Sequence, residues 1–510
     1  MKTVKKEYLP SYEQFKEFLI IMRALASAQG AEISSRMEYG IRFTLDTDGN
    51  PSSAAAGQRV MRYDGAIAEW SPNFTANVGD GTAVTTYNEN DFDLIDIFAP
   101  ERWVDDAGNI FRRFKPFYWG RQELGGYLYI WVCETPIYSF YKMPSAFIRN
   151  GKVGYRDIGV YEGGTEIIND VTYLCSKSGK NPMHNCNRTT FNNRAKAWET
   201  YLDVDTDKEW YGITQMSEIT EILQPLLIIM FGTRHSQSVF NGSANFSRTY
   251  CNNGLAVEAY DETTMTLYFS TDIRTNFRVG ATANVNNSTN EDYYRRVIAN
   301  GTVTGTIEGT TFTASEEGTT YYYVTIEGES FPATPATLWI RPLYTGETDV
   351  IEATNGTLSN SGYYSFKVLG IENIWGNIWT QILDVSMYDY VPYKLKDPYT
   401  FTGFSTATYT TYYTATNYEA CQSGWSYVKQ IGYDEAMPDV QFPIEVGGSS
   451  TTYYCDQYYV SAGAKTCYFG GQLYNGSNAG LFFWYVGNSV GTSAWAIGAR
   501  LSHWALREDL

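Results

Sequence analysis

Few residues capable of covalent chemistry stand in a spacing that supports it. The three histidines, His184, His235 and His503, match no metal-binding spacing such as HExxH. The chain contains no GxSxG segment, no phosphate-binding loop and no GxGxxG turn. A glycan-cleaving site would need two carboxylates close together, and no segment among the 56 acidic residues indicates such a pair. We therefore expect a protein that is not an enzyme, with no catalytic residues, no metal and no cofactor.

The cysteines indicate the compartment in which the chain folds. Their number is odd and they form no CxxC pair, at Cys133, Cys175, Cys186, Cys251, Cys421, Cys455 and Cys467. This pattern predicts neither a disulfide framework nor a zinc site. Free, buried thiols in a chain that folds in a reducing cytosol are the expectation.

The composition favours recognition by contact rather than by charge. Acidic residues outnumber basic ones by 56 to 38, and a net charge of −18 argues against binding nucleic acid through its phosphates. The 43 tyrosines outnumber 26 phenylalanines and 13 tryptophans together. Tyrosine offers a rigid contact surface with one polar tip, and aromatic residues also favour strands. The longest apolar run, residues 222–231, is too short to span a bilayer.

The first half of the chain alternates between helical and strand patterns. Residues 11–29 predict an amphipathic helix that could trimerise or attach to a larger assembly, or pack within the chain. Short strands are expected over residues 37–100 and 114–161. Two helices should follow, one carrying Phe191 to Leu202 and one over residues 214–231, which Pro225 should kink and Gly232 should end.

A change of composition marks an insertion. Between residues 243 and 365 threonine, glycine, asparagine and tyrosine rise and the pattern becomes plain alternation. This predicts an inserted domain similar to a β-sandwich. We expect three regions: residues 1–110 for attachment or oligomerisation, a main domain of residues 111–242 and 366–510, and the inserted domain of residues 243–365.

Five stretches of the main domain carry a resemblance. In order they read FIRNG…DIGVYEGG, NRTTFNNRAKAW, LLIIMFGTRHSQ, GIENIWGNIW and GLFFWYVGNS…AIGARL, at 147–164, 187–198, 226–237, 370–379 and 480–501. The chain resembles a family of bacteriophage virion proteins, head or tail fibre components, whose core is similar to the C-type lectin fold in its formylglycine-generating-enzyme-like version. The resemblance implies an α+β fold: a C-type-lectin-like domain with the inserted domain, an N-terminal helix and a small β region.

The segment GIENIWGNIW suits a scaffold role in such a loop-rich core. Gly370 and Gly376 permit a positive φ or a close approach of backbones. Asparagine side chains bond backbone groups across turns, and tryptophans bury large faces with one N–H as an anchor. We expect this segment to hold loops together through Asn373, Asn377, Trp375, Trp379 and the three isoleucines Ile371, Ile374 and Ile378.

The resemblance also implies that the last strands and loops form an exposed ligand face. Its candidate residues mix rigid aromatics with hydrogen-bonding side chains, as antibody paratopes do. They are Tyr474, Asn475, Ser477, Asn478, Phe483, Tyr485, Asn488, Ser489, Thr492, Ser493 and Trp495. Whether Phe483 and Tyr485 or Phe482 and Trp484 point outward is open at this stage. The calcium-dependent sugar-binding triplets of animal lectins are absent, so no calcium-mediated sugar binding is expected.

These features lead to a functional hypothesis with alternatives. We expect a structural, adhesive virion protein that assembles with other virion proteins in the host cytoplasm and forms a homo-oligomer, with a trimer suspected. Its ligand would be a glycan or protein on the bacterial surface, bound without nucleic acid and without membrane insertion. The alternatives are an architectural decoration or collar protein with no external ligand and, less favoured, a glycan depolymerase.

Overall fold

The structure is a computed structural model of the 510-residue chain. It describes residues 37–47, 57–63, 65–72, 74, 91–331, 333–353, 359–395, 397–401, 412–414, 424–434 and 437–508. The helix expected over residues 11–29 and Cys421 lie outside these described residues.

The expected α+β, C-type-lectin-like fold class is wrong. Strands account for 43% of the chain and helices for only 15%, and the strands gather into several sheets, one of them nearly closed into a barrel. Much of the alternation that the sequence shows is therefore true strand periodicity in a fold dominated by β-structure.

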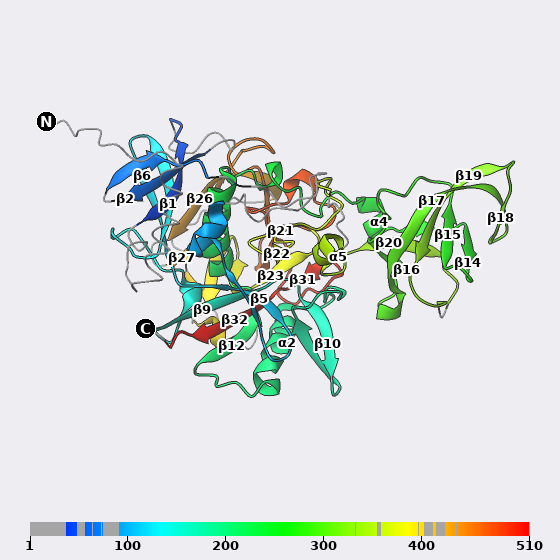
Figure 1. The fold of residues 1–510 in the computed structure, drawn as a ribbon, viewed down its shortest axis with the longest axis horizontal. Helices are drawn as coiled ribbons and strands as arrows, with labels where there is room; N and C mark the ends of the chain where they lie inside the picture. The colour runs from blue at the N-terminus through cyan, green and yellow to red at the C-terminus, as the bar shows by residue number, and fades with distance from the viewer. Residues whose placement is uncertain are drawn as a thin grey trace.

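A five-stranded antiparallel sheet holds the first described residues (Figure 1). Its order is β3-β2-β1-β7-β6, with β1 Glu38–Thr44, β2 Gln58–Tyr63, β3 Ala66–Glu69, β6 Tyr118–Leu124 and β7 Tyr127–Cys133. One face contributes Ile41, Phe43 and Val132 to the largest hydrophobic core. Two 3₁₀ turns, η3 Asp91–Leu94 and η4 Asp96–Phe98, add Phe92 and Phe98 to the same core.

A six-stranded sheet combines strands from the first half of the chain with the last described strand. Its order is β12-β32-β9-β5-β4, with β8 beside β9. The strands are β4 Glu101–Val104, β5 Ile110–Phe114, β8 Ile148–Arg149, β9 Lys152–Gly159, β12 Glu209–Ile213 and β32 Leu501–Leu506. The late strand β32 lies between β9 and β12 and pairs antiparallel with both. This sheet therefore cannot be completed by the first half of the chain alone.

Both expected internal helices are present. Helix α2, Arg188–Tyr201, begins at Asn187, whose side chain caps the Thr190 N–H, and it buries Phe191, Ala195 and Trp198 against the six-stranded sheet and the β10–β11 hairpin. That hairpin consists of β10 Gly164–Ile168 and β11 Val171–Cys175.

The second helix shows how the chain accommodates Pro225. Proline has no N–H and its ring collides with the carbonyl one turn earlier. A wide π-helical turn, η6 Glu218–Leu223, precedes it and places Pro225 in the first turn of α3, Gln224–Phe231. Gly232 ends α3 at φ +72°, as predicted, and its N–H bonds the Ile228 carbonyl at 3.0 Å.

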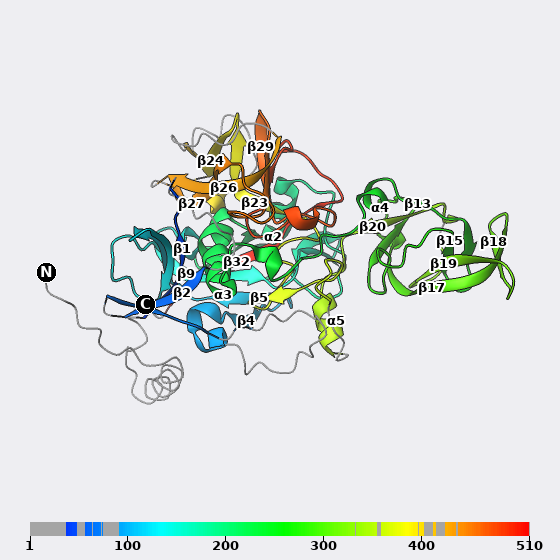
Figure 2. The ribbon, with the colours of Figure 1, turned by 90° about the horizontal axis from the view of Figure 1, so that it is seen from above.

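A nine-stranded sheet fills the later part of the chain (Figure 2). Its order is β25-β24-β23-β29-β30-β28-β26-β27, with β31 beside β23. The strands are β23 Trp379–Tyr388, β24 Val391–Leu395, β25 Tyr412–Thr414, β26 Gly424–Asp434, β27 Met437–Val446, β28 Gln457–Val460, β29 Ala464–Phe469, β30 Trp484–Val486 and β31 Ile497–Gly498. It curves so that β24, near one end, contacts β27 at the other.

The segment after α3 forms a lobe that stands apart from the other sheets (Figures 1 and 2). It begins with α4 Arg248–Asn252 and contains β13 Leu255–Ala256, β14 Ala259–Asp261, β15 Thr266–Phe269, β16 Thr282–Val285, β17 Tyr294–Glu308, β18 Thr311–Ala314, β19 Thr319–Ile326 and β20 Thr337–Arg341. These eight strands make one continuous sheet through the long strand β17, instead of the two separate sheets of a sandwich. The bounds of the three predicted regions stay predictions.

The remaining helices and strands are short connections between the sheets. They are η5 Ser145–Phe147, η7 Ser236–Ser238, η8 Glu291–Tyr293, α5 Glu347–Ala353, β21 Lys367–Val368, β22 Ile371–Glu372, η9 Pro398–Thr400 and η11 Gly476–Asn478.

Residues 370–379 contact both the main body and the lobe and hold them together. Trp375 is 1% exposed and packs in the largest core, while its Nε1–H reaches the Phe240 carbonyl. The Asn377 side chain accepts the Leu343 N–H at 2.7 Å and donates to Glu162. Because Leu343 belongs to the core of the lobe, Asn377 ties the lobe to the main body. Burial of Ile371, Ile374 and Ile378 agrees with the predicted scaffold role. Trp379 departs from it, because this ring is only half-buried and no described residue accepts its Nε1–H.

Gly376 gives the first testable prediction. It has φ +82°, and a Cβ there would lie 2.7 Å from the backbone nitrogen of Ser243. Gly309 is the matched control, with φ +62° and open space around it. We expect Gly309→Ala to cost only the left-handed strain, about 1–2 kcal/mol, and Gly376→Ala to cost clearly more in urea unfolding. Equal costs would mean that the Ser243 backbone yields freely.

Candidate functional site

A row of aromatic side chains crosses one face of the nine-stranded sheet. The strand register sets Trp425 opposite Tyr459, Tyr459 opposite Tyr485, and Tyr485 opposite Tyr468. Trp379 on β23 stacks on Tyr485 with ring centroids 4.6 Å apart and planes 12° apart. We call these five residues the aromatic row.

Most rings of the aromatic row stack on one another. Tyr459 and Tyr485 stack at 5.0 Å and 12°, and Trp379 stacks on both Tyr485 and Tyr468. Such offset stacks contribute about 0.5–1.5 kcal/mol per pair beyond their buried area. The stacks fix the rings, and exposure rises along the row from Tyr468, which is fully buried, through the half-buried Tyr485 and Tyr459 to Trp425.

Trp425 differs from the other members of the row. It stands at the β26 end, tilted 48° to Tyr459, and is 45% exposed. It is one of few large apolar side chains that the described residues leave so accessible. The row therefore ends in an indole ring held in place by its neighbours and open to a ligand.

The opposite face of the same strands is core. Tyr458, Trp484 and Phe469 alternate with the row and are each at most 1% exposed. This settles the direction that the sequence left open: Phe482 and Trp484 point into the largest core, and Tyr485 points outward. Phe483 shares the side of Trp425, with centroids 5.9 Å apart, but it is fully covered.

Polar groups flank the aromatic row. Tyr427, two residues from Trp425 on β26, donates its hydroxyl to Asn478 Oδ1 at 2.6 Å. The Asn488 carbonyl accepts the Thr466 N–H at 3.1 Å, beside Tyr468. Partial burial raises the pKa of Tyr485, so its hydroxyl stays protonated and available as a donor.

The predicted loop residues lie around this face at varying exposure. Ser489 and Thr492 bond each other through their hydroxyls at 3.0 Å, and Ser477, Ser489 and Ser493 are exposed. Asn475 is occupied locally, because its side-chain oxygen accepts the Gln472 N–H at 2.8 Å. These residues form a rim, and the exposed serines leave hydroxyls accessible.

Two predicted ligand residues have a different place. Tyr474 and Trp495 lie 6.2 Å apart and pack against the core of the lobe, beside the fully buried Leu473. The Arg341 guanidinium of β20 covers the Trp495 ring at 4.7 Å. Both rings thus belong to the joint between lobe and body and do not join the aromatic row.

Sequence reasoning missed Trp425, Tyr459 and Tyr468. The alternation in GWSYV and QYYV was a usable signal for Trp425 and Tyr459, whereas Tyr468 lies in AKTCYF and is fully buried. Their pairing with β30, however, depends on a register that only the folded sheet defines.

A histidine–carboxylate cluster with the appearance of a catalytic site is closed to substrate. His503 Nδ1 lies 2.7 Å from Asp157 Oδ2, which also receives Arg113, and His503 Nε2 faces Glu209 at 3.5 Å. Burial by itself lowers the pKa of His503, but the bonds to Asp157 and Glu209 outweigh burial and raise it. His503 is fully buried under Trp103, which stacks on it. A substrate cannot reach the cluster, so its role is to stabilise the six-stranded sheet.

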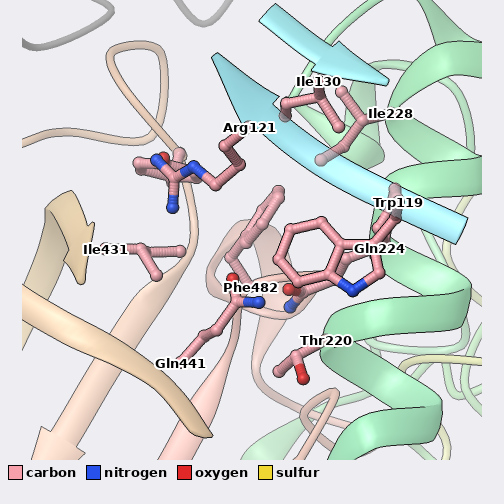
Figure 3. Close-up of a pocket in the computed structure, with 11 residues that line it drawn as sticks. Trp119, Arg121, Ile130, Thr220, Gln224, Ile228, Ile431, Gln441 and Phe482 are labelled. Carbon is pink, nitrogen blue, oxygen red and sulfur yellow. The ribbon is translucent and has the colours of Figure 1, made fainter. Parts of the chain in front are cut away.

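A small cavity between α3 and the nine-stranded sheet is also a poor ligand site (Figure 3). Trp119, Gln224, Gln441 and Phe482 line it, and its volume is about 30 Å³. That volume holds about two water molecules, far less than a sugar ring needs. The aromatic row is consequently the better candidate.

The described residues also offer neither a metal site nor a membrane-spanning helix. No group of three or more histidine, cysteine, aspartate or glutamate side chains there is placed to hold a metal ion. Of the helices in those same ranges, none combines the length and the apolar character needed to cross a bilayer.

Comparison with known proteins adds no relative. No protein-family model and no curated protein matches the chain.

Proposed function

We propose that the chain is a structural, receptor-binding protein of a bacteriophage virion, a head or tail fibre component. It binds a glycan or protein of the bacterial surface without covalent chemistry. The five sequence stretches that resemble phage virion proteins support the virion part of this proposal. The acidic, tyrosine-rich composition supports recognition by contact area.

The observation that carries the binding part is the exposed Trp425 at the end of a rigid aromatic row. An indole ring that is already immobilised loses little conformational entropy when a ligand stacks on it. Tyr485 and the exposed serines of the rim provide hydroxyls that give the contact direction. One stacking contact contributes only about 1 kcal/mol, so adhesion at this face requires several copies acting together. A homo-oligomer is part of the proposal for this reason.

Trp425→Ala tests the proposal. We expect particles or purified oligomers with this change to lose adsorption to host cells by at least about tenfold, since copies that each lose ~1 kcal/mol multiply their losses. The control is Tyr201→Ala, which removes an aromatic ring of similar exposure, 46% against 45%, from the end of α2. Thermal unfolding midpoints of the two variants should match each other, because each variant loses ring contacts with buried neighbours.

Adsorption unchanged by Trp425→Ala would contradict binding through this face. If a map of the intact particle then shows the aromatic row covered by other virion subunits, the architectural alternative holds instead.

A further inference from the structure

Two strands from opposite parts of the nine-stranded sheet meet through their side chains. Both edges of β24 pair, one with β23 and one with β25, and β27 pairs with β26. β24 nevertheless contacts β27 (Figure 2). At this β24–β27 contact, Lys394 Nζ of β24 lies against Asp439 Oδ2 of β27.

This contact is sealed from water. The Lys394 side chain is 11% exposed and the Asp439 side chain 2%. Ser145 Oγ touches both groups, donating to Asp439 Oδ2 at 2.8 Å and lying 3.4 Å from Lys394 Nζ. Beyond Ser145 lies the buried Glu221, whose Oε2 accepts the Ser145 N–H at 2.8 Å and whose Oε1 accepts Trp119 Nε1–H at 3.1 Å.

The surroundings favour the uncharged forms of Lys394 and Glu221. Burial lowers the pKa of Lys394 although the nearby Asp384 and Glu221 oppose the shift, and burial raises the pKa of Glu221. A neutral lysine amine is a nucleophile, and a protonated carboxyl group can lose its hydroxyl as water. A buried ion pair also pays a large desolvation penalty, which an amide would not carry.

We infer that Lys394 and Asp439 form an intramolecular isopeptide bond between β24 and β27. The bond covalently joins two strands of the nine-stranded sheet that contact each other through these side chains, and it requires only the groups already in contact. This inference is independent of the proposed receptor binding, because it concerns the β24–β27 contact and not the aromatic row.

The reaction is a condensation that balances without an oxidant or a co-reactant. A proton passes from the Lys394 ammonium to the contacting Asp439 oxygen, which gives a neutral amine and a carboxyl group. Nζ attacks Cγ of Asp439, and a new C–N bond forms. Ser145 Oγ, in contact with both groups, carries the second amine proton to the departing hydroxyl. The Cγ–O bond breaks and one water molecule leaves.

The mass of the purified full-length chain under denaturing conditions tests the inference. We expect it to be lower than the sequence mass by one water molecule, and a tryptic digest to contain one cross-linked species joining the Lys394 and Asp439 peptides. A measured mass equal to the sequence mass, with the Lys394 and Asp439 peptides separate in the digest, would overturn the inference, whatever the variants do.

Two variants identify the atoms involved. Lys394→Arg keeps the charge but cannot condense, so its mass should equal its sequence mass; a water loss that persists there comes from another site and overturns the assignment. Asp439→Asn should lose ammonia instead of water, since its leaving group is different. Ser145→Ala should slow the mass change without altering the β-sheet circular dichroism, and an unchanged rate would remove Ser145 from the reaction.

Discussion

Arg500→Met should lower the free energy of unfolding by about 3–5 kcal/mol, the largest effect that we expect from one substitution. The Arg500 guanidinium is buried and donates to four backbone carbonyls, those of Gly159 and Val160 at 3.0 and 3.1 Å and those of Glu372 and Asn373 at 2.7 and 2.8 Å. Methionine fills similar space but leaves all four carbonyls without this donor inside the protein.

The effect of Arg500→Met should appear in urea unfolding as a lower midpoint with a similar slope. Arg102→Met is the control, because Arg102 is exposed on β4 and its loss should change stability by less than about 0.5 kcal/mol. A midpoint for Arg500→Met close to that of the control would show that other donors or water replace the guanidinium.

The second large effect is a fall in stability as the pH rises. Burial raises the pKa of Glu162 to about 8 and that of Glu372 to about 7, from the ordinary 4.5. Between pH 4.5 and 8 the folded chain therefore holds more protons than the unfolded chain, and the free energy of unfolding decreases with pH. His503 acts in the same direction, because its raised pKa makes its contribution disappear as the pH increases above 6.5.

We expect the two glutamates to contribute a decrease on the order of a few kcal/mol between pH 5 and 8. Glu162→Gln should flatten this dependence, because glutamine stays neutral and its amide oxygen can still accept from Asn377. Glu308→Gln, at an exposed position of β17, should leave the dependence unchanged. Thermal unfolding midpoints at several pH values measure the slope. A slope for Glu162→Gln equal to that of the control would mean that Glu162 is ionised in the folded protein.

The sequence predicts local structure better than it predicts the fold. The caps and apolar spacing around α2, the stop at Gly232 and the buried role of Trp375 depend on neighbours in sequence, so they can be read directly. The strand β23 cannot, because eight successive residues are buried on both faces and show no alternation. Without β23 the nine-stranded sheet cannot be predicted from the sequence, so the α+β expectation that the resemblance implied was not corrected.

The candidate site likewise contains residues that the sequence predicts and residues that it does not. Tyr485 lies in a segment that the resemblance singled out, and its outward direction follows once the core face of β30 is known. Trp425 reaches the same row only through pairing of β26 with β28. Tyr474 and Trp495 are residue types that are common on binding surfaces, but they pack against the core of the lobe. The sequence alone does not show that the lobe packs there.

The central position of β32 has a consequence for how the protein is made. Its neighbours β9 and β12 leave the ribosome long before it, on the order of tens of seconds at roughly 5–20 residues per second. During that interval the edges of β9 and β12 that pair with β32 in the folded protein lack this partner, because β32 is not yet synthesised. Nascent chains are thus exposed to mispairing at these two edges. Any product cut short before Leu501 leaves the gap between β9 and β12 open, which makes it a target for proteolysis.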